Sequence, residues 1–204
     1  MIEAQRTRSE QKRQQIVAAA SSLFMQHGYL STSMDEVAQQ AGVSKQTVYA
    51  HFGSKDDLFT YCIESKCVVA TRIPDTLEGQ DPQQVLTEFM RAFSEMIHSE
   101  EALYVYRLCV TQAESHPELS RRYFEAGPLR VQRVLADYLA KLQRSGKLSL
   151  PDPMLAAEQL LLMGRGMRHL ACELGLPCEE SQRKSEQRLS SAITLFLSGY
   201  GYQG

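Results

Sequence analysis

The sequence lacks the features that mark several large classes of protein. None of its 204 residues is tryptophan. No run approaches 18 uninterrupted apolar residues, so we expect no membrane-spanning helix. The first residues are polar and lack the apolar stretch of a signal peptide. With 12 glycines and 7 prolines, the chain is neither collagenous nor of low complexity. The five cysteines are odd in number and form no Cys-x-x-Cys pair, which predicts reduced thiols and a cytoplasmic protein.

Signatures of catalysis and of metal binding are also missing. Neither a G-x-S-x-G elbow nor a P-loop occurs in the sequence. The five histidines are scattered, and none has a histidine, cysteine or acidic partner at metal-ligand spacing. We therefore predict no catalytic residue, no metal and no cofactor. An all-helical enzyme or small-molecule-binding protein remains the alternative to the function developed below.

Charge is nearly balanced overall but unevenly distributed. The formal net charge is −2, yet residues 1–55 hold six basic and four acidic side chains, while the remainder holds 16 basic and 20 acidic ones. A mildly basic head on an acidic body is compatible with one end that faces nucleic acid. A solvated surface explains the same asymmetry, so charge alone does not decide between them.

Helical periodicity dominates what is present, and it predicts an all-α fold. Residues 34–41 and 45–52 have the pattern of two short helices separated by about three residues. Ser33 and Glu36 have capping-box spacing at the start of the first helix, and Gly42 suits the left-handed backbone that ends it. Two helices joined by such a turn form a helix-turn-helix, whose second helix can enter the major groove of DNA.

A helical wheel of residues 45–52 sharpens this interpretation. Val48 and Phe52 fall on one side and should face the core, while Gln46 and Ala50 lie opposite. Glutamine can read adenine, and alanine can approach a thymine methyl group. The pattern indicates a groove-facing helix, with a plain helical hairpin that has a polar outer face as the alternative.

The same residues resemble a known family. Thr32 to Lys55, which includes Gly42-Val-Ser and Val48-Tyr-Ala-His-Phe, is similar to the amino-terminal domain of TetR-type bacterial transcriptional regulators, and the likeness extends over 8–60. It implies a homodimer of about nine helices that binds double-stranded operator DNA. We accordingly place a DNA-binding domain at 1–54 and a ligand-binding and dimerisation domain at 55–204. The implied contacts are Lys45, Gln46 and Thr47 to bases, Tyr49, His51 and Lys55 to phosphates, and Thr32, Ser33 and Ser44 to the DNA backbone.

The body resembles the AefR-like carboxy-terminal regulatory domain through Tyr106-Arg-Leu-Cys-Val and the stretch from Pro117 to Gly127. This resemblance favours helix for 103–110, where periodicity alone does not separate a buried helix from a strand, and it implies an effector pocket. Thioethers and aromatic rings with few polar anchors suit a small apolar or aromatic effector, although core packing explains any one of them. Arg107 could meet an anionic group of the effector or form a salt bridge. The predicted lining is Phe93, Met96, Tyr104, Arg107, Leu108, Phe124, Met163 and Met167.

The last two predicted helices, 153–174 and 181–198, account for assembly. Leu155 and Leu162 lie off the main apolar stripe of the first helix, so that helix has two apolar faces. Burial in one large domain is the alternative, but the family resemblance places a two-fold dimer contact here. The predicted interface residues are Leu155, Leu162, Leu189, Ile193 and Phe196. The sequence thus predicts a dimeric regulator, a repressor that a small effector releases from its operator, with activation left open.

Overall fold

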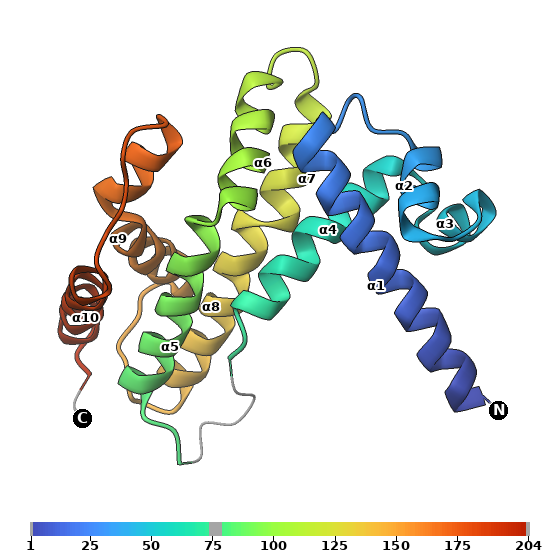
Figure 1. Ribbon diagram of the computed structural model, residues 1–204. Helices are drawn as coiled ribbons and strands as arrows, with labels where there is room; N and C mark the ends of the chain where they lie inside the picture. Colours follow the sequence, from blue (N-terminus) through green and yellow to red (C-terminus); the bar gives the residue numbers. More distant parts are fainter. Residues whose placement is uncertain (1, 74–78, 203–204) are drawn as a thin grey trace. The chain divides into compact units, whose positions relative to one another are not determined.

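The computed structural model describes residues 2–73 and 79–202 of the chain (Figure 1). Within those residues the chain forms ten helices and no strand, which confirms the predicted all-α class. The helices are α1 (Ile2–His27), α2 (Met34–Ala41), α3 (Lys45–Phe52), α4 (Lys55–Ala70), α5 (Pro82–Ile97), α6 (Glu100–Thr111), α7 (Pro117–Ala126), α8 (Pro128–Arg144), α9 (Pro153–Glu173) and α10 (Gln182–Gly199).

The chain divides into two compact units. The first unit comprises Met1–Ser65 together with Leu108–Ala126, and the second comprises Lys66–Arg107 together with Gly127–Gly204. Helices α4 and α6 are each continuous from one unit to the other. The predicted boundary between residues 54 and 55 separates two functions, whereas these units are separated by compactness. The predicted functional division stays a prediction.

The first unit is built on the buried stripe of α1. Ile16 and Ala20 are fully buried, and Gly28, with φ 84°, turns the chain out of the helix. Phe24 and Tyr29, on either side of that turn, place their rings 5.7 Å and 4.9 Å from the ring of Phe59 in α4. This aromatic cluster fixes the turn that leads into α2. Figure 1 shows that the first half of α1 extends beyond α2 and α3.

The second unit is a helical bundle around α8, α9 and α10. Helix α8 packs against α9, while α10 packs against both α5 and α9. Leu135, Leu139, Leu160 and Ile193 are fully buried or nearly so in this bundle. Apolar residues at helical spacing place this core on one face of each helix.

Two glycines set the course of α9. A methyl group on Gly164 would lie 2.1 Å from Cε of Met90 and 3.8 Å from Phe93, so this glycine allows α5 and α9 to approach closely. Gly166 has φ 59° and ψ −178°, a conformation outside the helix, and it kinks the element. Arg188 of α10 donates a hydrogen bond to the carbonyl of Gly164. The uninterrupted helix predicted over 153–174 is therefore broken at Gly166.

The cysteines differ in part from the prediction. Cys172 and Cys178 form a disulfide with their Cα atoms 5.2 Å apart, so the prediction of reduced thiols is wrong for this pair. The chain reverses after α9 at Gly175, where φ is 72°, and this turn brings the two cysteines together although they are six residues apart. Cys62, Cys67 and Cys109 are not part of this disulfide and are buried, and burial raises the pKa of the Cys109 thiol to about 12.

In the part of the chain that the structure describes, no helix combines the length and the apolar character that crossing a bilayer requires.

Candidate nucleic-acid interface

Side-chain caps hold α2 and α3 as two well-defined short helices. The Ser33 hydroxyl accepts a hydrogen bond of 3.2 Å from the amide of Glu36, whose carboxylate accepts one of 2.7 Å from the Ser33 amide. These bonds form the predicted capping box and lower the pKa of Glu36. Gly42 then adopts the left-handed conformation at φ 66°. The Ser44 hydroxyl caps α3 by accepting a bond of 3.1 Å from the Thr47 amide.

Helix α3 has one buried side and one exposed side, as the helical wheel predicts. Val48 is fully buried and Phe52 nearly so, while Gln46 and Ala50 are exposed. Tyr49 is 42 % exposed on the same helix. The exposed side therefore carries an amide, a methyl group and a phenol on a helix fixed at both ends. Such a surface can donate to and accept from base edges and phosphates.

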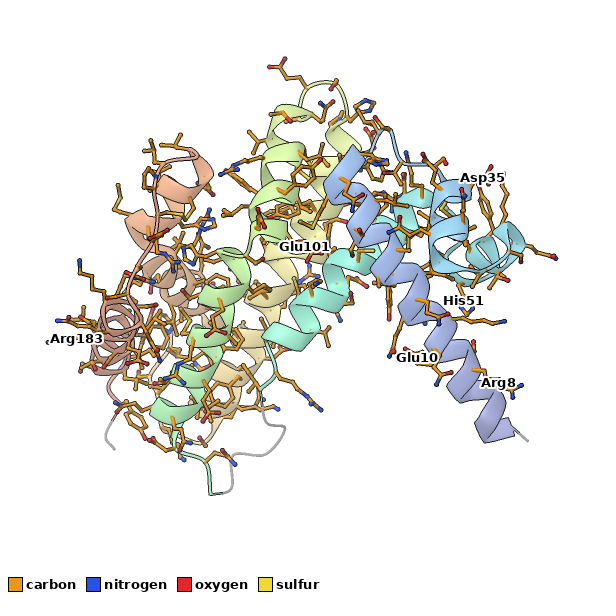
Figure 2. The ribbon with its side chains drawn as sticks, in the orientation of Figure 1. Arg8, Glu10, Asp35, His51, Glu101 and Arg183 are labelled. Atoms are coloured by element: carbon orange, nitrogen blue, oxygen red, sulfur yellow. A yellow bond between two sulfur atoms is a disulfide. The ribbon has the colours of Figure 1, made fainter. Side chains whose placement is uncertain are left out.

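Lys45 lies at the start of α3 in a weak, exchangeable ion pair. Its ammonium group is 2.8 Å from the carboxylate of Asp35 in α2, and both side chains are more than half exposed. The hydrogen bond that Lys45 donates to the Asp35 carboxylate raises the pKa of Lys45. Exposed pairs of this kind contribute little to stability, so Lys45 can leave Asp35 for a phosphate. Figure 2 labels Asp35 and His51, which lie on α2 and α3.

Two predicted DNA contacts make their principal hydrogen bonds inside the protein. Thr32 is 1 % exposed, and its hydroxyl donates to the carbonyl of Gly28 at 2.8 Å. The Lys55 ammonium donates to three carbonyls of the turn between α1 and α2. Those acceptors are Tyr29 at 2.9 Å, Leu30 at 3.3 Å and Thr32 at 3.1 Å. Burial lowers the pKa of Lys55. A DNA contact from either residue stays a prediction and would compete with these bonds.

Helix α7 belongs to the first unit and holds the start of α4, a contact that sequence reasoning missed. The Arg122 guanidinium lies 3.4 Å from Asp56 and 3.5 Å from Asp57, and it donates to the Thr60 hydroxyl at 3.3 Å. Tyr29 donates its hydroxyl hydrogen to Asp56, and burial raises the pKa of Tyr29. The partners are up to 66 residues apart in sequence, so no local pattern could have indicated them.

The residues of the predicted effector lining are divided between the two units. Leu108 and Phe124 belong to the first unit, and the other six residues belong to the second. Phe93 is buried, whereas Phe124 is 55 % exposed and Met167 is 78 % exposed. Met163 lines an open hollow of about 360 Å³. The other residues of that hollow are Gln159, Leu195, Phe196, Gly199 and Tyr200. The lining stays a prediction.

Arg107 has a role that neither interpretation of the sequence included. Its guanidinium donates to the carbonyl of Glu173 at 3.1 Å and to that of Cys172. The last carbonyls of a helix have no partner within the helix and carry partial negative charge. Arg107 therefore caps the carboxy-terminal end of α9.

The predicted dimer residues fall into two groups. Leu189, Ile193 and Phe196 are buried within the second unit, because this stripe of α10 faces α5 and α9. Leu155 is 45 % exposed and Leu162 is 55 % exposed. Further exposed apolar side chains on α9 and α10 are Met167, Leu170 and Leu195. A contact with a second copy stays a prediction, and the exposed group supports it better than the buried one.

Comparison with known proteins agrees with this architecture. Residues 16–62 match the model for bacterial regulatory proteins of the tetR family. Residues 84–202 match that of the AefR-like transcriptional repressor, carboxy-terminal domain. The transcriptional regulator HbdR of Aromatoleum sp. (strain CIB) is 34 % identical over 76 residues, which are 37 % of this chain and 30 % of that protein. The match thus spans less than a third of that curated relative.

Two solved structures are similar over almost the whole chain. One is a protein from Mesorhizobium loti MAFF303099 described as a TetR-family transcriptional regulator, with 30 % identity and a TM-score of 0.73 over 95 % of this chain and 98 % of that one. The other is the flavonoid-responsive regulator FrrA, with 32 % identity and a TM-score of 0.72 over 92 % of this chain and 96 % of that one. The two family models match in order along the chain, the first over the helix-turn-helix and the second over the helical body. The chain therefore belongs to the TetR family of transcriptional regulators, with an AefR-like carboxy-terminal domain.

Proposed function

We propose that the protein is a homodimeric repressor in the bacterial cytoplasm that binds operator DNA through α3 and leaves it when a small apolar or aromatic effector binds. The exposed side of α3 carries this proposal. Gln46 and Ala50 lie opposite the buried Val48 and Phe52, Tyr49 is exposed beside them, and Lys45 stands at the start of the helix in an exchangeable pair. Both ends of the helix are capped, so these side chains meet DNA on a rigid support.

The names of related proteins support the regulatory part of the proposal. The carboxy-terminal family model is that of a transcriptional repressor, and FrrA is flavonoid-responsive by name. An aromatic effector is consistent with a second unit that contains Phe93, Tyr104 and Met163. The relatives are named as regulators, which favours a regulator over the all-helical enzyme.

A second copy of the chain is the partner that we propose for the exposed apolar residues of α9 and α10. Leu162, Met167 and Leu195 are each more than half exposed, which is unusual for side chains of this size gathered on two neighbouring helices. Two α3 helices in a dimer would read half-sites about 34–36 Å apart, or one helical turn of DNA. The operator should therefore be approximately palindromic.

Selection of duplexes from a random-sequence pool by the full-length protein tests the DNA-binding proposal. We expect enrichment of a palindromic duplex, and Gln46→Ala should weaken binding to it by about 1–3 kcal/mol with loss of discrimination at particular base pairs. Gln187→Ala, an exposed change on α10, is the matched control and should leave binding unchanged. Failure to enrich any duplex, or a Gln46→Ala variant that keeps the parent's affinity and its discrimination between base pairs, would contradict the proposal.

A further inference from the structure

Two histidines of the second unit meet where α5 ends beside the kinked part of α9. The rings of His98 and His169 lie 5.2 Å apart in an edge-to-face arrangement. His169 is 7 % exposed. One ring nitrogen of each residue, Nε2 of His98 and Nδ1 of His169, is buried without a hydrogen-bond partner among the described residues.

The partners of the other two nitrogens define what the unpartnered ones need. Nδ1 of His98 lies 2.6 Å from the Ser94 carbonyl, which only accepts, so this nitrogen carries the proton. Nε2 of His169 lies 3.0 Å from the Glu173 carboxylate and also donates. In a neutral imidazole the second nitrogen is then an acceptor. Two buried acceptors therefore lie in adjoining rings, and each is unfavourable while no donor meets it.

Burial selects the kind of donor. Burial lowers the pKa of both histidines, that of His169 to about 4, and Arg165, Arg168 and Arg188 add to this effect. Glu173 and Glu180 pair with these arginines, so burial and not net charge disfavours a cationic donor such as an ammonium group. A carboxylate brings no proton to share. A neutral donor such as a hydroxyl group avoids the cost of burying a charge.

Aromatic rings lie along the helix contacts next to the pair. Phe93 of α5 approaches Gly164 of α9, and His98 meets His169 five residues further along both helices. The break at Gly166 lies between these two points of contact. Irregular backbone inside helices is frequent at functional sites. The ring of Tyr106 is a third one here, 6.4 Å from His169.

We propose that His98 and His169 form a hydroxyl-recognition site for phenolic compounds, in which these two buried nitrogens share the one hydroxyl hydrogen of a neutral phenol in a three-centre bond. This inference rests on the proposed effector response and names the chemical class of the effector. It assigns His98 and His169 as binding residues, both of which the sequence prediction left out.

Phenol and toluene, which have the same shape, test the site in the full-length protein. Toluene is the more apolar, so an ordinary apolar pocket prefers toluene, whereas a site with unpartnered acceptors prefers phenol. Calorimetric titration should show phenol binding about 2- to 10-fold more tightly, the factor of one neutral hydrogen bond. Phenol should also move the imidazole nitrogen resonances of His98 and His169. Toluene binding as tightly as phenol, or unmoved histidine resonances, would overturn the proposal.

Variants and operator binding separate this site from the proposed function. His98→Phe and His169→Phe should abolish the preference for phenol, and His116→Phe, outside the site, should retain it. If phenol binds and moves both resonances without weakening operator binding, the site stands and the effector response fails. If phenol releases the operator equally from the parent and from His98→Phe, the effector response stands and the site is wrong.

Discussion

Lys55 illustrates how one side chain can stabilise a turn that carries a binding surface. Its ammonium donates to the carbonyls of Tyr29, Leu30 and Thr32 and lies 4.5 Å from the centre of the Tyr29 ring. Lys55→Met leaves these carbonyls without their donor, and we expect the free energy of unfolding to fall by about 1–3 kcal/mol in urea titrations. Lys45→Met, in an exposed pair, is the control. Equal stability of both variants would show that the Lys55 bonds contribute nothing.

Lys45 should affect DNA binding where Lys55 affects stability. Because its pair with Asp35 is exposed, Lys45 is available to a phosphate. Lys45→Met should lower the slope of log affinity against log salt by about one unit. The measurement is titration of the enriched duplex at several salt concentrations. Arg183→Met, an exposed change on α10, should leave the slope as it is. A slope unchanged by Lys45→Met would remove this residue from the interface.

The histidine pair makes stability depend on pH. The pKa of His169 is about 4 and that of His98 is also lowered, whereas both are near 6.5 in the unfolded chain. Below pH 6.5 the unfolded chain therefore binds more protons than the folded one, so stability should fall as the pH drops from 6.5 toward 4. Urea midpoints between pH 7 and 4.5 measure the fall. His169→Phe should flatten it, and an equal fall in that variant would assign it to other groups.

At the scale of single elements, the kink of α9 depends on one residue. Gly166 has φ 59° and ψ −178°, which residues with a side chain rarely adopt, and a methyl group there would lie 3.4 Å from Cδ of Arg188. We expect Gly166→Ala to lower the free energy of unfolding by about 1–3 kcal/mol, as judged by chemical denaturation. Gly199→Ala, where the added methyl group meets nothing within 4 Å, should be neutral or slightly stabilising. Similar effects of both changes would show that the kink does not require a glycine at position 166.

Local signals predicted most of the elements. The bounds of α2 and α3 follow from Ser33, Gly42 and Ser44, which cap or end the neighbouring helix. Gly127-Pro128 separates α7 from α8, because glycine is flexible and the proline ring interrupts a helix. The kink at Gly166 could not be predicted, because a glycine in an apolar helix also serves close packing, as Gly164 does.

The candidate site was predicted less completely, because tertiary contacts decide how its side chains are used. The exposure of Gln46 follows from helical geometry alone. The partners of Lys55 and Arg122 lie 23 to 66 residues away, beyond any periodic pattern. Apolar periodicity indicates that Leu189 and Leu162 both lie on apolar helix faces that another surface should bury. It does not show that the same chain covers the first and leaves the second exposed.

At the scale of the whole molecule, the proposed dimer predicts the effect of one charge. Leu162 is 55 % exposed on α9, and an arginine there would be buried without a partner if a second copy covers it. Leu162→Arg should yield monomers in sedimentation analysis and weaken operator binding. Val110→Arg, at the equally exposed Val110 of α6, is the matched control and should remain dimeric. A dimer in both variants would exclude this part of α9 from the interface.

The division of the chain has a consequence for building chimaeric regulators. Residues 108–126 come from the part of the sequence that matches the carboxy-terminal family model, yet they fold with the first unit, where Arg122 meets Asp56 and Asp57. A body transplanted from another family member brings its own version of α7. The graft therefore keeps this contact only if that helix presents a cation to the recipient's two aspartates, and a body whose α7 lacks the cation loses it.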